Sequence, residues 1–213
     1  MPNNKIDHFA IGADTLEQGI SALKTTLGVD VPRGGKHDAM STHNCVMQSG
    51  NESFFELIAI DPDAPADPGR ARWFTLDDPK TQARLLERPR ALCWVVGTDD
   101  LDAVIAASPI ELGEVVLFTR GDRSWRLTVP KDGSLPMQGL LPAFIEWSPG
   151  PHPSTGQQDL GVTLETVHLH HSDPETLSKM LVALGVDHLA QVHEGDVALS
   201  FELNTLNGSV TLD

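Results

Sequence analysis

The stretch that decides the fold is residues 7–16, which read DHFAIGADTL. It is a short apolar strand followed by a glycine, a small residue and an aspartate that can cap a helix. Sliding the chain by 85 residues places the same pattern on residues 92–101, LCWVVGTDDL. Sliding it by 159 residues places the pattern on residues 166–175, TVHLHHSDPE. The pattern therefore occurs three times, which indicates an internal repeat.

A helix is expected after each of these strands. Asp14 can accept hydrogen bonds from the first-turn amides, and Glu17 follows at the spacing of a capping box. Apolar residues then recur at helical spacing as far as Gly28, which ends the helix. Asp99 and Asp173 are the corresponding caps of the second and third helices.

Three further strands are expected in each unit, which gives the order β-α-β-β-β. In the first unit, 42–48 and 53–60 predict strands, and the Gly34-Gly35 region predicts a loop. The strands of the other two units are expected at 113–119, 123–129 and 142–147, and at 190–193, 197–204 and 208–212. Residues 70–90 predict an insert with some helix.

The predicted fold class is α+β, built from repeated βαβββ modules. Links rich in proline, glycine and aspartate separate the modules. We expect one domain at 1–150, made of modules at about 5–60 and 91–148, and a third module at 157–213.

Composition limits the class of protein. The net charge of −15 argues against nucleic acid and anionic membranes as partners, because phosphate binding needs a basic patch. The chain has no signal-peptide pattern and no apolar run long enough to span a bilayer. Its two cysteines, Cys45 and Cys93, make no disulfide framework. We therefore expect a cytoplasmic protein.

A lone glutamate interrupts two strongly apolar strands. Glu56 lies in FFELI at 54–58, and Glu146 lies in FIEW at 144–147. Burying a carboxylate is costly unless a cation, a donor or a proton compensates for the lost hydration. Because the two glutamates occupy similar places in two modules, we predict one site built from both halves.

This repeat, with Asp7-His8 in its first strand and Glu56 in its fourth, resembles the vicinal oxygen chelate superfamily. Members include glyoxalase I, extradiol dioxygenases and the fosfomycin and bleomycin resistance proteins. The run GGKHDAMSTHN at 34–44, followed by FELIAIDP at 55–62, more closely resembles the glyoxalase-like domain proteins. The resemblance implies that the first two modules form one cupped sheet.

The resemblance also implies a metal inside the cup, with ligands from the first and fourth strands of each module. These positions in this chain are His8, Glu56, Cys93 and Glu146. Cys93 departs from the family pattern, which usually has histidine or glutamate there. Two hypotheses follow: His8, Glu56 and Glu146 hold a divalent metal (Zn, Mn, Ni, Co or Fe(II)), or a metal-free cup binds an organic ligand.

Four further residues are candidates for substrate binding. His37 and His43 could act as acid, base or ligand, because an imidazole titrates near neutral pH. Asn44 could orient a substrate oxygen, and Trp94 could line the cavity, although core packing is the default for a tryptophan. His168 and His170 share one face of a strand, but no carboxylate is evidently placed with them, so we interpret them as a polar sheet face.

Our first functional hypothesis is a metal-assisted lyase or isomerase acting on a small oxygenated metabolite. Glu56 and Glu146 would be the catalytic residues, and one of them could leave the metal to move a proton. The alternative is a metal-free protein that binds or sequesters a small molecule, as bleomycin resistance proteins do. A third hypothesis is a cup filled by its own side chains. The unpaired third module favours a homodimer.

Overall fold

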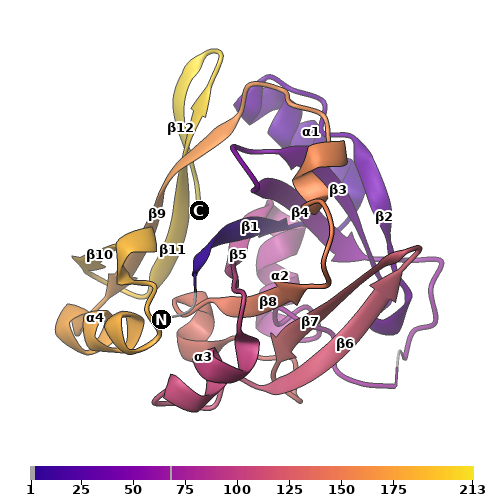
Figure 1. The fold of residues 1–213 in the computed structure, drawn as a ribbon. Helices are drawn as coiled ribbons and strands as arrows, with labels where there is room; N and C mark the ends of the chain where they lie inside the picture. The colour runs from indigo at the N-terminus through magenta and orange to yellow at the C-terminus, as the bar shows by residue number, and fades with distance from the viewer. Residues whose placement is uncertain (1–2, 68) are drawn as a thin grey trace.

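The computed structural model describes residues 3–67 and 69–213, so the first two residues of the predicted 1–150 domain lie outside it. The fold is α+β, as predicted, with the order β-α-β-β-β occurring three times (Figure 1). None of the described helices is long and apolar enough to cross a membrane.

The elements of the first two modules follow the predicted order. The first contains β1 (Lys5–Gly12), α1 (Leu16–Leu27), β2 (Arg33–His37), β3 (Thr42–Gln48) and β4 (Phe54–Ile60). The helix of the insert is α2 (Pro79–Glu87). The second module contains β5 (Arg90–Gly97), α3 (Leu101–Ala107), β6 (Glu114–Arg120), β7 (Arg123–Val129) and β8 (Ala143–Trp147).

These two modules share one curled sheet with the strand order β2-β3-β4-β1-β5-β8-β7-β6. The first strands, β1 and β5, pair antiparallel at its centre, and each pairs parallel with the fourth strand of its own module. The sheet is therefore two copies of one arrangement joined back to back, and β2 and β6 are its outer edges.

The prediction of a loop at Gly34-Gly35 was wrong, because both glycines belong to β2. The pairing of β2 with β3 shifts register between Arg33 and Lys36, so the glycines occupy an irregular part of the strand. Such irregularities bend an edge strand and re-aim its neighbours, and glycine tolerates them at little steric cost.

Two of the three predicted helix caps differ by one residue. Thr15, rather than Asp14, caps α1, and its hydroxyl accepts from the Gln18 amide at 3.1 Å. Asp100, rather than Asp99, caps α3. Asp173 caps the third helix as predicted. Adjacent residues that can both cap a helix leave its start uncertain by one position.

The third module has the predicted order of elements, but its strands pair in a different order from those of the first two modules. It contains β9 (Thr163–His171), α4 (Pro174–Ala183), β10 (Gln191–Glu194), β11 (Ala198–Thr205) and β12 (Gly208–Leu212). Its strand order is β10-β9-β11-β12, so the strand after the helix pairs directly with the first strand. The Phe201 ring lies 4.9 Å from that of Phe9, which places this sheet beside β1 (Figure 1).

The central strands of the large sheet are buried on both faces. One face packs against α1, α3 and the third module through residues such as Phe9, Phe55 and Phe144. The other face forms the inside of the cup, where Ala10, Ile58 and Trp125 of the sheet pack with Trp73 and Phe74 of the insert. Because both faces are apolar, hydrophobic alternation along a central strand does not reveal which side chains enter the cup.

We expect Thr15→Ala to lower the free energy of unfolding by about 1 kcal/mol, because it leaves a first-turn amide of α1 without its acceptor. Denaturant unfolding of the variant beside Asp14→Ala provides the measurement. The Asp14 side chain does not cap the helix, so its removal should have a smaller effect. A larger loss in Asp14→Ala would contradict the observed cap.

Candidate functional site

The cup contains a cavity of about 50 Å³. Both modules contribute to its wall, together with the insert after β4 and the link after β8. The lining residues are His8, His37, Asn44, Val46, Phe54, Glu56, Trp73, Phe74, Arg120, Trp125, Leu127, Ile145, Trp147, Pro153 and Gln157. The polar groups come mostly from the first module, and most of the second module's residues are apolar or aromatic.

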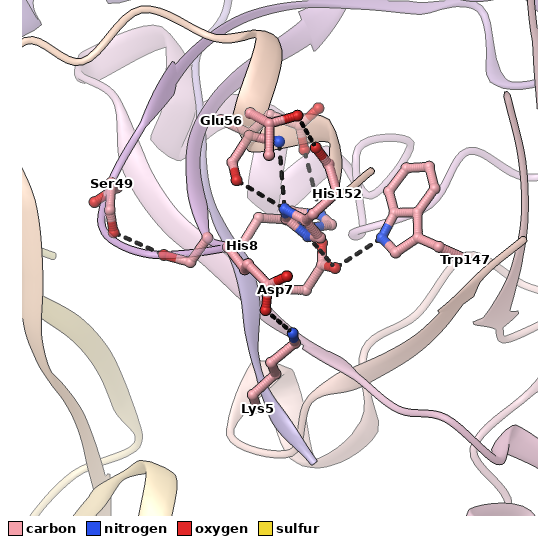
Figure 2. Close-up of polar contacts among 11 residues, drawn as sticks. Lys5, Asp7, His8, Ser49, Glu56, Trp147 and His152 are labelled. Atoms are coloured by element: carbon pink, nitrogen blue, oxygen red, sulfur yellow. Dashed lines mark hydrogen bonds and ion pairs between the residues drawn. The ribbon is translucent and has the colours of Figure 1, made fainter. Parts of the chain in front are cut away.

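A buried carboxylate, Asp7, anchors one side of the cup. It accepts hydrogen bonds from Nδ1 of His8 at 2.6 Å, Nε1 of Trp147 at 2.7 Å and Nε2 of His152 at 2.9 Å (Figure 2). Burial raises the pKa of Asp7, but the hydrogen bonds from His152 and His8 and their charges outweigh it and lower the pKa from 3.8 to about 2. The group is therefore a permanent anion at physiological pH.

Asp7 fixes both the orientation and the tautomer of His8. An ionised carboxylate only accepts hydrogen bonds, so Nδ1 of His8 carries the proton. In the neutral ring, Nε2 is then left as an acceptor. This nitrogen faces Glu56, and its distance to Oε2 of Glu56 is 3.8 Å (Figure 2).

Glu56 on β4 is the buried carboxylate of the cavity and is only 4% exposed. Its Oε1 accepts a hydrogen bond from Nδ2 of Asn44 at 2.6 Å. Nε2 of His37 lies 4.0 Å from the same oxygen. Oε2 accepts no hydrogen bond from the residues that the structure describes, so Glu56 presents one free oxygen beside His8.

Two glycines of β2 orient the Asn44 amide. The Gly35 amide donates to Oδ1 of Asn44 at 2.8 Å, which turns Nδ2 toward Glu56. A Cβ at Gly34 would lie 2.3 Å from Oδ1 of Asn44, so a side chain at this position would displace the amide. The Gly34-Gly35 pair is thus part of the site, a role that the sequence did not indicate.

His37 is a neutral imidazole in the wall of the cup. Its Nδ1 lies 3.1 Å from the Thr42 hydroxyl, and its ring packs edge-on against Trp73. Burial is the largest influence on its pKa and, against the raising effect of the Glu56 carboxylate, lowers it to about 4; the positive charge of Arg120 lowers it further. The structure therefore brings His8, His37, Asn44 and Glu56 together.

Glu146 does not lie in the cup. It accepts from the Leu101 amide at the start of α3, at 3.2 Å, and pairs with Arg126 at 2.9 Å. The strand register explains this outcome. Ala10 pairs with Glu56, whereas Val95, which the 85-residue shift places on Ala10, pairs with Ala143. Ala143 therefore occupies the place of Glu56, and Glu146 lies three residues further on, on the opposite face.

Three other residues that the sequence predicted for the site do not contribute a polar group to the cup. Cys93 takes the place of His8 but is completely buried, and burial raises the pKa of its thiol well above the usual range. Trp94 belongs to the core on the helix-covered face and donates from Nε1 to the Leu140 carbonyl at 3.2 Å. His43 points away from the cup and lines a separate cavity beside α1.

The predicted metal ligands do not form one set. Of the four family positions, only His8 and Glu56 combine a suitable side chain with a place in the cup. Among residues 3–67 and 69–213, no group of three or more His, Cys, Asp and Glu side chains is arranged to hold a metal ion. The donor set His8, Glu56 and Glu146 therefore does not fit a metal in this cup.

Several site residues had little signal in the sequence. Asp7 stands directly before His8, so an orienting carboxylate could have been inferred from the motif. His152 and Gln157 belong to a proline- and glycine-rich link, and Trp73 belongs to the insert. These segments reach the cup through long-range contacts, and such contacts leave no local pattern in the sequence.

The curled sheet of paired modules, with its polar groups inside the cup, defines a vicinal oxygen chelate protein. The family model for the glyoxalase-like domain matches residues 6–185, and the chain belongs to this family. No curated protein matches the sequence significantly.

Several solved structures are similar to the chain at low identity. A hypothetical protein from Staphylococcus aureus is 18% identical, with a TM-score of 0.62, over 98% of this chain and 84% of that one. Methylmalonyl-CoA epimerase from Mycobacterium tuberculosis is 17% identical, with a TM-score of 0.43, over 71% and 91%. A mutant of 4-hydroxymandelate synthase from Streptomyces coelicolor is 17% identical, with a TM-score of 0.49, and this chain spans 63% of its length.

We expect Asp7 to contribute about 2 kcal/mol of pH-dependent stability, from the difference between its pKa of about 2 and the ordinary 3.8. Because the folded-state pKa is the lower one, this contribution is complete above about pH 4 and is lost as pH falls toward 2. Denaturant unfolding of the wild type and Asp7→Asn between pH 6 and pH 2 measures it. Parallel stability curves for the two proteins would contradict the assignment.

We expect Glu146→Gln to give the same Zn²⁺ titration as the wild type, with any affinity unchanged within about twofold, because Glu146 binds the start of α3 outside the cup. Loss of an oriented metal ligand or its support typically costs about 10- to 100-fold. Calorimetric titration of the wild type and the variant with Zn²⁺ tests this. A tenfold weaker affinity in Glu146→Gln would return Glu146 to a metal site.

Proposed function

We propose that this protein is a lyase or isomerase of the glyoxalase type that moves a proton on a small oxygenated metabolite. The observation that carries the proposal is the buried Glu56 carboxylate, whose free oxygen lies 3.8 Å from Nε2 of His8, with both residues lining the cavity. A carboxylate and an oriented imidazole that face the same small space are suited to general acid–base catalysis.

Glu56 is the proposed base. The Asn44 amide holds Oε1, so Oε2 is the oxygen that can take a proton from a carbon next to a substrate carbonyl. Burial of the carboxylate leaves room for few water molecules that would compete for this oxygen.

His8 is the proposed partner in proton transfer. Its Nε2 lies close enough to Oε2 of Glu56 to reach neighbouring atoms of one small substrate. When Nε2 takes the proton of a substrate hydroxyl, the Asp7 carboxylate stabilises the imidazolium through Nδ1. His8 can then return the proton to a substrate oxygen or carbon.

Two unsatisfied groups support an oxygenated substrate. Nε1 of Trp73 and Oε1 of Gln157 are buried and have no hydrogen-bond partner among the described residues. Both residues line the cup. A buried donor or acceptor without a partner costs about 1–3 kcal/mol, which a substrate carbonyl or hydroxyl would recover.

The size of the cavity limits the substrate. A volume of about 50 Å³ holds a few water molecules. A metabolite of more than a few heavy atoms would require the aromatic walls or the link after β8 to move. This favours a small substrate.

The proposal assigns no step to a metal, because the cup lacks the ligand set that the metal-assisted hypothesis requires. A cytoplasmic location and a homodimer remain predictions.

A second candidate function is a metal-free binding or sequestering protein. The aromatic walls favour it, since Trp73, Phe74, Trp125 and Trp147 all line the cavity. Such a protein would bind an apolar molecule without changing it, and Glu56 would provide only a polar contact.

We expect Glu56→Gln to lower the rate of proton exchange by at least about 100-fold, since it removes the base. The measurement is deuterium incorporation from D₂O into a panel of small 2-oxo and 2-hydroxy carbonyl compounds, including hydroxyacetone and pyruvate, followed by NMR. Glu146→Gln is the matched control, because the same change outside the cup should leave the rate within about twofold of the wild type.

Deuterium exchange at the wild-type rate in Glu56→Gln would contradict the proposal that the protein is an enzyme with Glu56 as its base. Saturable binding of panel compounds, with no exchange above the uncatalysed rate in the wild type or either variant, would instead support a binding or sequestering protein.

A further inference from the structure

Arg120 crosses the opening between the two edges of the cup. It is the last residue of β6, an outer strand of the large sheet, and it lines the cavity. A Cβ at Gly35, on the opposite outer strand β2, would lie 3.1 Å from Nη1 of Arg120. The guanidinium therefore lies against the bare backbone of β2, and the absence of a side chain at Gly35 provides the room.

Arg120 is also the only lysine or arginine that lines the cavity. It forms no ion pair with the residues that the structure describes, although the chain has twice as many acidic as basic residues. Its neighbour Arg126 pairs with Asp102 and Glu146, outside the cup. The charge of Arg120 is thus available to a ligand.

The guanidinium affects the interior of the cup. Its positive charge opposes protonation of His37, in addition to the larger effect of burial. The polar groups deeper in the cup include the Glu56 carboxylate and the His8 imidazole. An anionic group of a ligand would be repelled by Glu56 and attracted by Arg120, so it would bind at the Arg120 end.

We propose that Arg120 binds the carboxylate of the substrate, and that the substrates are small 2-oxo or 2-hydroxy carboxylates. This inference rests on the proposed function for the reacting end of the molecule. A guanidinium can bind a carboxylate through two parallel hydrogen bonds, which fixes orientation as well as position. With its carboxylate at Arg120, the substrate directs its oxygenated carbon into the cup, where Glu56 and His8 lie.

The test compares each carboxylate with its uncharged amide: pyruvate with pyruvamide, and lactate with lactamide. Binding is followed by tryptophan fluorescence, since Trp73, Trp125 and Trp147 line the cavity. The wild type should bind at least one carboxylate about tenfold more tightly than its amide, the difference expected for a charge-assisted pair.

Three variants test whether Arg120 is the source of the preference for the carboxylate over the amide. Arg120→Met removes the charge but keeps an apolar stem, so it should abolish the preference and leave the amide affinity within about twofold. Arg120→Lys should retain part of the preference, because it keeps a charge without the two-pronged geometry. Arg123→Met is the matched control, because Arg123 lines a different pocket and should retain the full preference.

Equal affinities for carboxylate and amide in the wild type would overturn the proposal. So would a full preference in Arg120→Met, or the absence of saturable binding for every carboxylate tested. Glu56-dependent deuterium exchange without a carboxylate preference would overturn this inference alone. Arg120-dependent carboxylate binding without deuterium exchange would overturn the proposed enzymatic function but would still support a carboxylate-binding site at Arg120.

Discussion

The site depends on one buried anion. Asp7 receives hydrogen bonds from its sequence neighbour His8 and from Trp147 and His152, which lie 140 and 145 residues further along the chain. An unpaired carboxylate with 1% exposure would be very costly, so the three donors and the anion require one another. The same contacts orient His8 and hold Trp147 and His152 against the cup.

A second chain of contacts orients the proposed base. The backbone of β2 sets the Asn44 amide, and the amide in turn holds Glu56. This arrangement uses a bare backbone at Gly34, so the irregular edge strand contributes directly to the site. Asp7 thus orients the imidazole from within β1, and β2 orients the carboxylate through Asn44.

The sequence predicted the repeat, the α+β class and the order of elements well, because strand–glycine–cap patterns are local and periodic. It did not predict which face of a strand enters the cup. Both faces of β4 and β8 are buried. Alternation therefore shows that Glu146 and Phe144 share one face of the strand, but it does not show whether that face lies inside the cup. Trp94 and His43 were misplaced for the same reason, since each lies one residue from a position that faces the cup.

The two modules form one cup but contribute different surfaces to it. Where the first has His8 and Glu56, the second has Cys93 and Ala143, so the polar groups cluster on one side. The opposite wall is built from Trp125, Leu127 and Ile145, with Arg120 at its edge. The cup therefore has a polar wall on the first module, an apolar wall on the second and a guanidinium at its edge. This asymmetry, and not the duplication itself, gives the cavity distinct polar and apolar sides.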